Sequence, residues 1–224
     1  MFKELIEVWK GKESLLDEVV TDFEEMLRIG SAMYEKVMSA LLDGEASPDL
    51  RKDLYKEDAK LNMLEQTIRR KIVSQLSSSE GVEEPIASCL ILMSISKDAE
   101  RIGDYVKNMF TIYEVKPGIS REEPYYGRLK AVKKEISELF ESVQSAYQDS
   151  NTEEARRLVA KAYNAQKICD ENLKDLLLAT PGEDHVAYAV LSRFSKRSLA
   201  HLSNIATSIF MPVTKIDFFD EIKE

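Results

Sequence analysis

The sequence is poor in the residues that make turns. It has eight glycines and six prolines among 224 residues, whereas average usage is about 7% Gly and about 5% Pro. An all-β protein needs many tight turns, so this scarcity argues against one and favours long helices. All six prolines lie at the edges of periodic segments, where a proline does not interrupt a helix.

Cysteine and histidine are scarce as well. The two cysteines, Cys89 and Cys169, lie far apart and form no metal or redox motif, so we expect both to pack in the core. Neither histidine, His185 or His201, follows a glutamate by three residues, so the Glu-x-x-His of a ferritin-like di-iron bundle is missing. A Gly-rich phosphate loop and a Gly-x-Ser-x-Gly motif are also missing. The sequence therefore predicts a protein that is not an enzyme.

The charge balance and the lengths of the apolar runs limit which partners and which cellular location the protein can have. The chain has 40 acidic and 31 basic side chains, a net charge of -9 and no basic run. This balance argues against a nucleic-acid groove and against a patch for anionic membranes. The uncharged segment Pro85–Ser96 is too short to span a bilayer. The N-terminus lacks the layout of a signal peptide, so we expect a cytoplasmic protein.

Apolar residues recur at helical spacing through most of the chain. The pattern predicts six helices, at about 14–42, 48–76, 85–114, 124–148, 152–178 and 184–211. Gly44 is the expected C-terminal stop of the first helix, and Ser47 and Asn151 are expected to cap the second and the fifth. Residues 1–10 are typical of a short helix that Trp9 would anchor to the bundle or offer to a partner, and residues 213–224 stay unassigned.

Long helices with short connections are typical of antiparallel bundles. We therefore predict an all-α fold of two tandem three-helix bundles, residues 1–116 and 117–224, divided at Pro117. The two halves look like copies, because Arg101-x-x-x-Tyr105-x-x-Asn108 is echoed by Arg197-x-x-x-His201-x-x-Asn204. The segment 86–93 is apolar nearly all round, so we expect it to be covered on several sides where the halves meet.

Two helices carry rows of oxygen-bearing side chains. Three such residues of the third helix lie within a sector of about 80°, and three of the second helix share another; they are Glu100, Asp104 and Asn108, and Asp58, Asn62 and Glu65. Acids that border an apolar stripe must be satisfied, and facing rows of oxygen ligands suit a hard cation such as magnesium, manganese or iron. The alternative is a solvated face on which Lys97 and Arg101 neutralise the acids.

These same segments resemble the signature of the PhoU family. The resemblance rests on residues 97–108, with Glu-Arg-Ile-Gly-Asp at their centre, and on Asp58-x-x-x-Asn62-x-x-Glu65 followed by Ile68-Arg69. It implies a dimeric cytoplasmic protein of two similar three-helix bundles that restrains phosphate uptake and reports phosphate status. The partners it implies are phosphate transporter components and a sensor kinase. It also implies that metal ions (iron, manganese, magnesium or zinc) bind through the acidic motifs.

The second half departs from the acidic pattern. When Asn204 is aligned with Asn108, Lys196 and Ala200 take the places of the two signature acids, although Asp170 remains as the counterpart of Asn62. An ammonium repels a cation and a methyl group cannot coordinate one, so we expect metal only in the first half.

The sequence thus predicts a non-enzymatic regulator of phosphate uptake and phosphate signalling that acts through protein contacts. The alternative is a soluble regulatory module of another ion transporter, of the sodium–phosphate or potassium type. A metal-dependent enzyme is the least favoured reading, because it would need an open coordination site in a cleft with a base nearby.

Overall fold

The computed structural model describes residues 15–78 and 84–216. Within these ranges the chain forms six α-helices, and no strand occurs. The helices are α2 (Leu15–Met38), which a π-helical turn η1 (Ser39–Asp43) continues, α3 (Leu50–Ser78), α4 (Glu84–Val115), α5 (Pro124–Gln148), α6 (Thr152–Leu178) and α7 (His185–Thr207). The all-α prediction is confirmed. Residues 1–10 with Trp9, and residues 217–224 of the tail, lie outside the described residues.

Most helix ends follow from local chemistry. Gly44 closes the first helix in the left-handed conformation, with φ 77°, which glycine adopts without a Cβ penalty. The side chain of Asn151 caps α6 by accepting a hydrogen bond from the backbone N–H of Glu154 at 3.0 Å. At the start of α3 the hydroxyl of Ser47 accepts the backbone N–H of Asp49 at 3.3 Å, as expected of a cap. The N–H of Leu50 donates to the carbonyl of Ser47 in the same turn, and the regular helix begins at Leu50.

The last helix ends earlier than the pattern predicted. It stops at Thr207 rather than near Met211, and residues 213–216 form a short 3₁₀ turn. The hydroxyl of Thr207 donates to the carbonyl of Ile216 at 2.9 Å, so the chain folds back against the end of α7.

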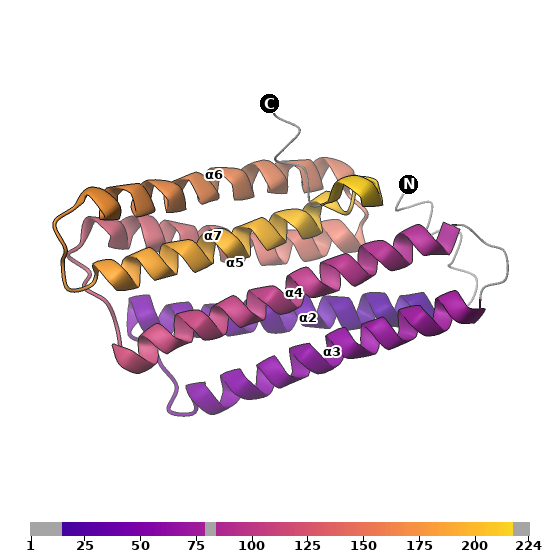
Figure 1. Ribbon diagram of the computed structural model, residues 1–224, viewed down its shortest axis with the longest axis horizontal. Helices are drawn as coiled ribbons and strands as arrows, with labels where there is room; N and C mark the ends of the chain where they lie inside the picture. The colour runs from indigo at the N-terminus through magenta and orange to yellow at the C-terminus, as the bar shows by residue number, and fades with distance from the viewer. Residues whose placement is uncertain (1–14, 79–83, 217–224) are drawn as a thin grey trace.

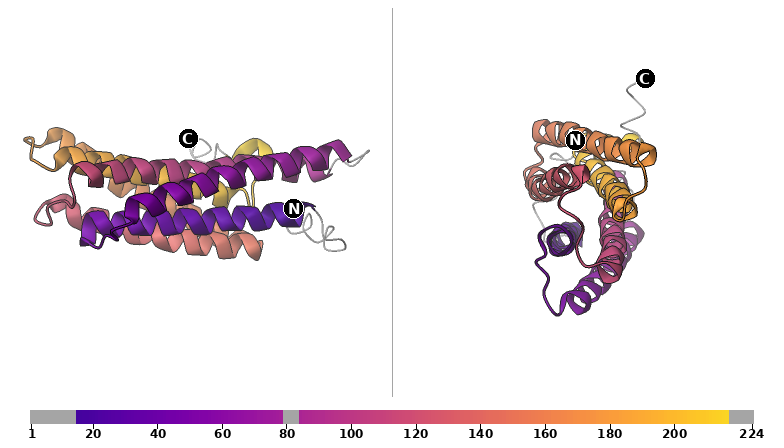
Figure 2. Two further views of the ribbon diagram at one scale, coloured as in Figure 1. Left: turned by 90° about the horizontal axis from the view of Figure 1, so that it is seen from below. Right: turned by 90° about the vertical axis from the view of Figure 1, so that its left-hand side faces the viewer.

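The helices run along one long axis in layers (Figures 1 and 2). Helices α2, α3 and α4 contact one another, as do α5, α6 and α7. The main contacts between these groups, over the described residues, are those of α4 with α7 and of α2 with α5. Helix α3 packs on α2 and α4, and α6 packs on α5 and α7, so α3 and α6 form the two outer layers in Figure 1. No described helix is both long and apolar enough to cross a membrane.

The core runs through both groups of helices as one cluster of buried apolar side chains. It includes three fully buried tyrosines, Tyr34, Tyr147 and Tyr188. Both cysteines are fully buried and unpaired, as predicted. Burial raises the pKa of the Cys169 thiol to about 12 and that of Cys89 above its ordinary value, so neither forms a reactive thiolate at neutral pH.

The apolar N-terminal part of α4 is covered less than expected. Ile86 and Leu90 are 47% and 45% exposed, so the prediction that this segment is enclosed on several sides is wrong at these two positions. Helix α7 does not cover these two positions, because it contacts α4 further along the helix, at Asp98 and Tyr105.

Asp184 ties the linker between the two halves to the start of α7. Its carboxylate accepts the backbone N–H of Ser120 at 2.7 Å and pairs with Lys116. Burial raises the pKa of Asp184, but these two partners outweigh it, and the pKa lies below its ordinary value. The carboxylate is therefore held ionised at the junction.

Candidate functional site

Helices α3 and α4 bring the predicted acidic rows face to face. They can lie close together because Gly103 of α4 has no side chain: an added Cβ would be 2.6 Å from Cδ1 of Leu61 on α3. Of the predicted acids, Glu65 and Glu100 are buried, at 7% and 9% exposure. The facing arrangement expected from the two helical patterns is therefore present.

Two lysines of α4 stand between the facing acids. Lys107 lies 2.8 Å from Asp58 on α3 and 3.0 Å from Asp104 on its own helix. Burial lowers the pKa of Lys107, but the bonds to both carboxylates outweigh that effect and raise it. The ammonium group of Lys107 thus bridges one acid of α3 and one acid of α4. A second bridge of this kind lies further along the two helices.

Lys97 makes that second bridge, 2.6 Å from Glu100 and 3.9 Å from Glu65. Glu65 also pairs with Arg69 at 2.5 Å. Lys97 was expected from the sequence as a neutralising residue. The other cation that bridges the two acidic rows is Lys107 rather than Arg101, which is exposed.

The two amides of the predicted set have lesser roles. Asn62 lies at the limit of hydrogen-bonding distance from Asp58, 3.5 Å, and Asn108 is exposed. Among the described residues, no group of three or more His, Cys, Asp or Glu side chains is arranged to hold a metal ion. In this arrangement the carboxylates fit lysine ammonium groups, and a metal would have to displace Lys97 or Lys107. Metal binding at this face stays a prediction.

The matching face of the second half is occupied differently. Lys196 of α7, at the place of Glu100, lies 2.6 and 2.7 Å from the two oxygens of Asp170 on α6. Asp170, the one acid that the second half retains from this pattern, is therefore already neutralised. This pairing agrees with the expected asymmetry between the halves, which metal titration would test.

The contact between α4 and α7 contains a polar cluster. His201 is 8% exposed, and its Nδ1 lies 2.5 Å from Oδ1 of Asp98, which is 7% exposed. Its Nε2 faces the Tyr105 hydroxyl at 3.4 Å, and the two rings stack with centroids 5.5 Å apart. Arg197 donates two hydrogen bonds to the same hydroxyl, at 3.0 and 3.2 Å. We call these four residues, together with Asn204, the junction cluster.

The junction cluster shows what the repeat in the sequence means. Tyr105 and His201 are equivalent positions of the two copies, and they stack on each other across the contact. Equivalence also relates Asp98 to Phe194; Asp98 bonds His201, and Phe194 stacks on Tyr105 at 5.7 Å. The repeat signal thus marked the residues at which the halves meet, and it left Asp98 unassigned because its counterpart has a different chemistry.

Two linked groups of three long helices define a class of helical fold, and known proteins share it. The family model described as "PhoU domain" matches residues 23–112. Among solved structures, "Crystal structure of PhoU from Pseudomonas aeruginosa" is similar over 87% of this chain and 95% of that chain, with a TM-score of 0.75 and 16% identity. A search of curated proteins gave no significant match.

Residues 23–112 therefore match the PhoU domain model, and the resemblance seen at residues 58–69 and 97–108 is confirmed. The matched region contains α3 and all but the end of α4, and so all six predicted site residues. The structural likeness extends the same fold to the second half.

Proposed function

We propose that this protein is a regulator of phosphate uptake and phosphate signalling that acts through protein contacts. The observation that carries the proposal is the PhoU domain over residues 23–112, supported by the likeness of nearly the whole chain to PhoU from Pseudomonas aeruginosa. The partners are phosphate transporter components and a sensor kinase. The protein works in the cytoplasm, as a homodimer and without catalysing a reaction of its own.

The geometry of the described residues is consistent with a contact protein. The acidic side chains of α3 and α4 are engaged by Lys97 and Lys107, and the junction cluster holds the two halves together. The long helices then present extended, rigid outer surfaces to a partner. Binding of metal ions such as iron or manganese at the acidic face of the first half remains part of the proposal. The metal would displace the lysines and bind to the carboxylates that now pair with them.

The test is deletion of the gene in its native organism, with uptake of radiolabelled phosphate measured under phosphate excess and phosphate limitation. We expect uptake under excess to rise in the deletion strain and to return to normal when the gene is restored. Affinity purification from both conditions should recover phosphate transporter components. Unchanged uptake, with recovery of only a potassium transporter or another ion transporter, would overturn the proposal.

A further inference from the structure

The most exposed charged side chains of the outer helix α3 are cations, and its acids are partly or fully buried. Its exposed charged side chains are all basic: Arg51, Lys52, Lys56, Lys60, Arg69 and Arg70. The other outer helix, α6, exposes four basic and four acidic side chains: Arg156, Arg157, Lys167 and Lys174, and Glu153, Asp170, Glu171 and Asp175. In a chain of net charge -9, the outside of α3 is thus a local basic surface.

Acids of α3 pair with the neighbouring helices, whereas Asp53 lines a groove between α2 and α3. Asp58 pairs with Lys107 of α4, and Glu57 pairs with Lys36 of α2 at 2.7 Å. Three of its exposed cations are paired, Arg51 with Glu114, Lys60 with Glu25 and Arg69 with Glu65. Among the described residues no ion pair involves Lys52 or Lys56. The positive charge of these two lysines is therefore available to an approaching partner.

Large apolar side chains lie on the same surface. Tyr55, Met63 and Val73 are 49%, 56% and 57% exposed. At 100° per residue, Tyr55 and Val73 point in the same direction and Met63 points about 80° away, so they form one stripe along the helix. We call this stripe and the exposed cations beside it the α3 outer face. Exposed apolar residues gathered with charges of one sign mark an interaction site more often than scattered ones do.

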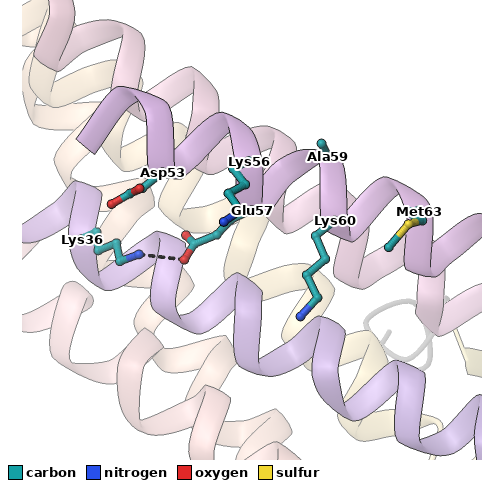
Figure 3. A pocket seen from close by; sticks show the side chains of 7 residues that line it. All are labelled: Lys36, Asp53, Lys56, Glu57, Ala59, Lys60 and Met63. Carbon is teal, nitrogen blue, oxygen red and sulfur yellow. Dashed lines mark hydrogen bonds and ion pairs between the residues drawn. The ribbon is translucent and has the colours of Figure 1, made fainter. Parts of the chain in front are cut away.

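A shallow groove runs beside the stripe, between α2 and α3. Figure 3 shows Lys56, Ala59 and Met63 along α3, with Lys60 reaching toward α2 and Lys36 bonded to Glu57. The groove has a volume of about 530 Å³. It follows the helix axis and is lined by Ala59 and Met63, by three lysine ammonium groups and by the carboxylates of Asp53 and Glu57, the second of which is paired with Lys36. An elongated groove of this kind has the shape that a second helix lying alongside would need.

We propose that the α3 outer face is a docking surface for an acidic amphipathic helix of a partner protein. The apolar residues of that helix would cover Met63 and Tyr55, and its carboxylates would meet Lys52 and Lys56. Charge complementarity favours such a partner over a second copy of this chain, because like net charges repel. The groove favours a rod-shaped partner over a flat membrane. The inference rests on the proposed function, since it names the kind of partner that a regulator would contact.

The experiment measures binding of a fluorescein-labelled helical peptide, built from Leu and Glu in a heptad repeat, to the full chain by fluorescence anisotropy. We expect Lys52→Glu/Lys56→Glu to weaken binding at least tenfold, which corresponds to about 1.4 kcal/mol. We expect Met63→Ala to weaken it as well. Raising the ionic strength from about 0.1 M to about 1 M should weaken the wild-type complex, because it shortens the Debye length from about 10 Å to about 3 Å.

The matched control lies on the other outer helix. Lys167→Glu/Lys174→Glu on α6 changes the net charge by the same amount and should leave the affinity unchanged, as should Leu177→Ala at an apolar residue that is 86% exposed. A peptide with Lys in place of Glu should not bind. Equal loss in the α3 and α6 variants, no binding of the acidic peptide, or stronger binding to phosphatidylglycerol vesicles than to the peptide would overturn the proposal.

The cellular readout separates this inference from the proposed function. If gene deletion alters phosphate uptake and the Lys52→Glu/Lys56→Glu variant restores it as well as wild type does, the docking surface is wrong and the function stands. If deletion leaves uptake unchanged while the peptide results hold, the function is wrong and the docking surface stands.

Discussion

The bond between His201 and Asp98 should be among the most costly to break in this protein. Asp98 is buried on α4, and within the described part of the chain two donors approach its carboxylate: Nδ1 of His201 at 2.5 Å and Nδ2 of Asn204 at 3.4 Å. Because an ionised carboxylate only accepts hydrogen bonds, Nδ1 of His201 must carry the proton. The other carboxylate oxygen has no hydrogen-bond partner among the described residues, so His201 supplies most of the stabilisation of the charge.

The perturbation is His201→Phe, which keeps a ring against Tyr105 and removes the donor. Asp98 is then left buried with one long hydrogen bond. Removing one member of a buried charged pair costs about 3–5 kcal/mol. A chain of this size loses about 2–4 °C of Tm per kcal/mol, so the expected loss in Tm is roughly 6–20 °C.

A double-mutant cycle isolates the cause. Replacing a whole buried pair with apolar residues of similar volume is often neutral or stabilising, so Asp98→Leu/His201→Phe should be more stable than His201→Phe alone. The assay is urea unfolding followed by circular dichroism at pH 7. A double variant that loses the sum of the two single losses, or a His201→Phe variant that loses under about 1 kcal/mol, would refute the reasoning, because either result means that no stranded charge is created.

Three shorter predictions rest on other contacts. Gly103→Ala should cost about 1–3 kcal/mol in urea unfolding, because its Cβ would overlap α3; an unchanged midpoint would contradict this. Since the pKa of Asp184 is lowered in the fold, its pairing with Lys116 stabilises the protein above about pH 4 and is lost as the pH falls below that; Asp184→Asn should reduce stability at pH 7 and flatten the acid limb of a pH titration of Tm. Lys97→Ala/Lys107→Ala should tighten Mn²⁺ binding in calorimetric titration, because the change frees the acidic face; weaker binding would show that the lysines do not compete with the metal.

The helices and their order could be predicted from the sequence because each helix buries one face. Apolar residues therefore recur every three or four positions, and the breaks coincide with residues such as Gly44 and Asn151 whose backbone or side chain ends or starts a helix. The end of α7 could not be read in this way. The apolar pattern continues past Thr207, but there the chain turns back to satisfy its own polar groups.

The acidic rows were visible for the same reason, since helical spacing shows which side chains share a face. Their partners were harder to assign, because spacing within one helix cannot tell which cation reaches across to a neighbour. Lys107 lies three residues from Asp104 and bridges two helices. Arg101 also lies three residues from Asp104, but it is exposed to solvent. The contact between Asp98 and His201 joins residues 103 positions apart, and only the packing of α4 against α7 brings them together.

The basic α3 outer face shows a different limit. In the sequence of α3 four acids are interspersed among the cations, and the net charge of -9 argues against any cationic surface. Packing then turns Glu57 and Asp58 toward α2 and α4 and leaves Lys52 and Lys56 outside. Net charge constrains the average of a surface, whereas the fold decides how the charges are distributed over it.

The division at Pro117 describes a repeat, and we predict that it does not describe two independent folding units. Phe23 of α2 packs against Tyr147 of α5 with ring centroids 5.2 Å apart, and Tyr34 packs against Phe140 at 6.3 Å. Phe23 and Tyr34 are fully buried, and exposing a large apolar side chain costs about 1.5–3 kcal/mol. The fragment 1–116 should therefore self-associate in light scattering and melt without a cooperative transition, and a monomeric fragment that melts sharply would show that the first three helices are stable without the other three.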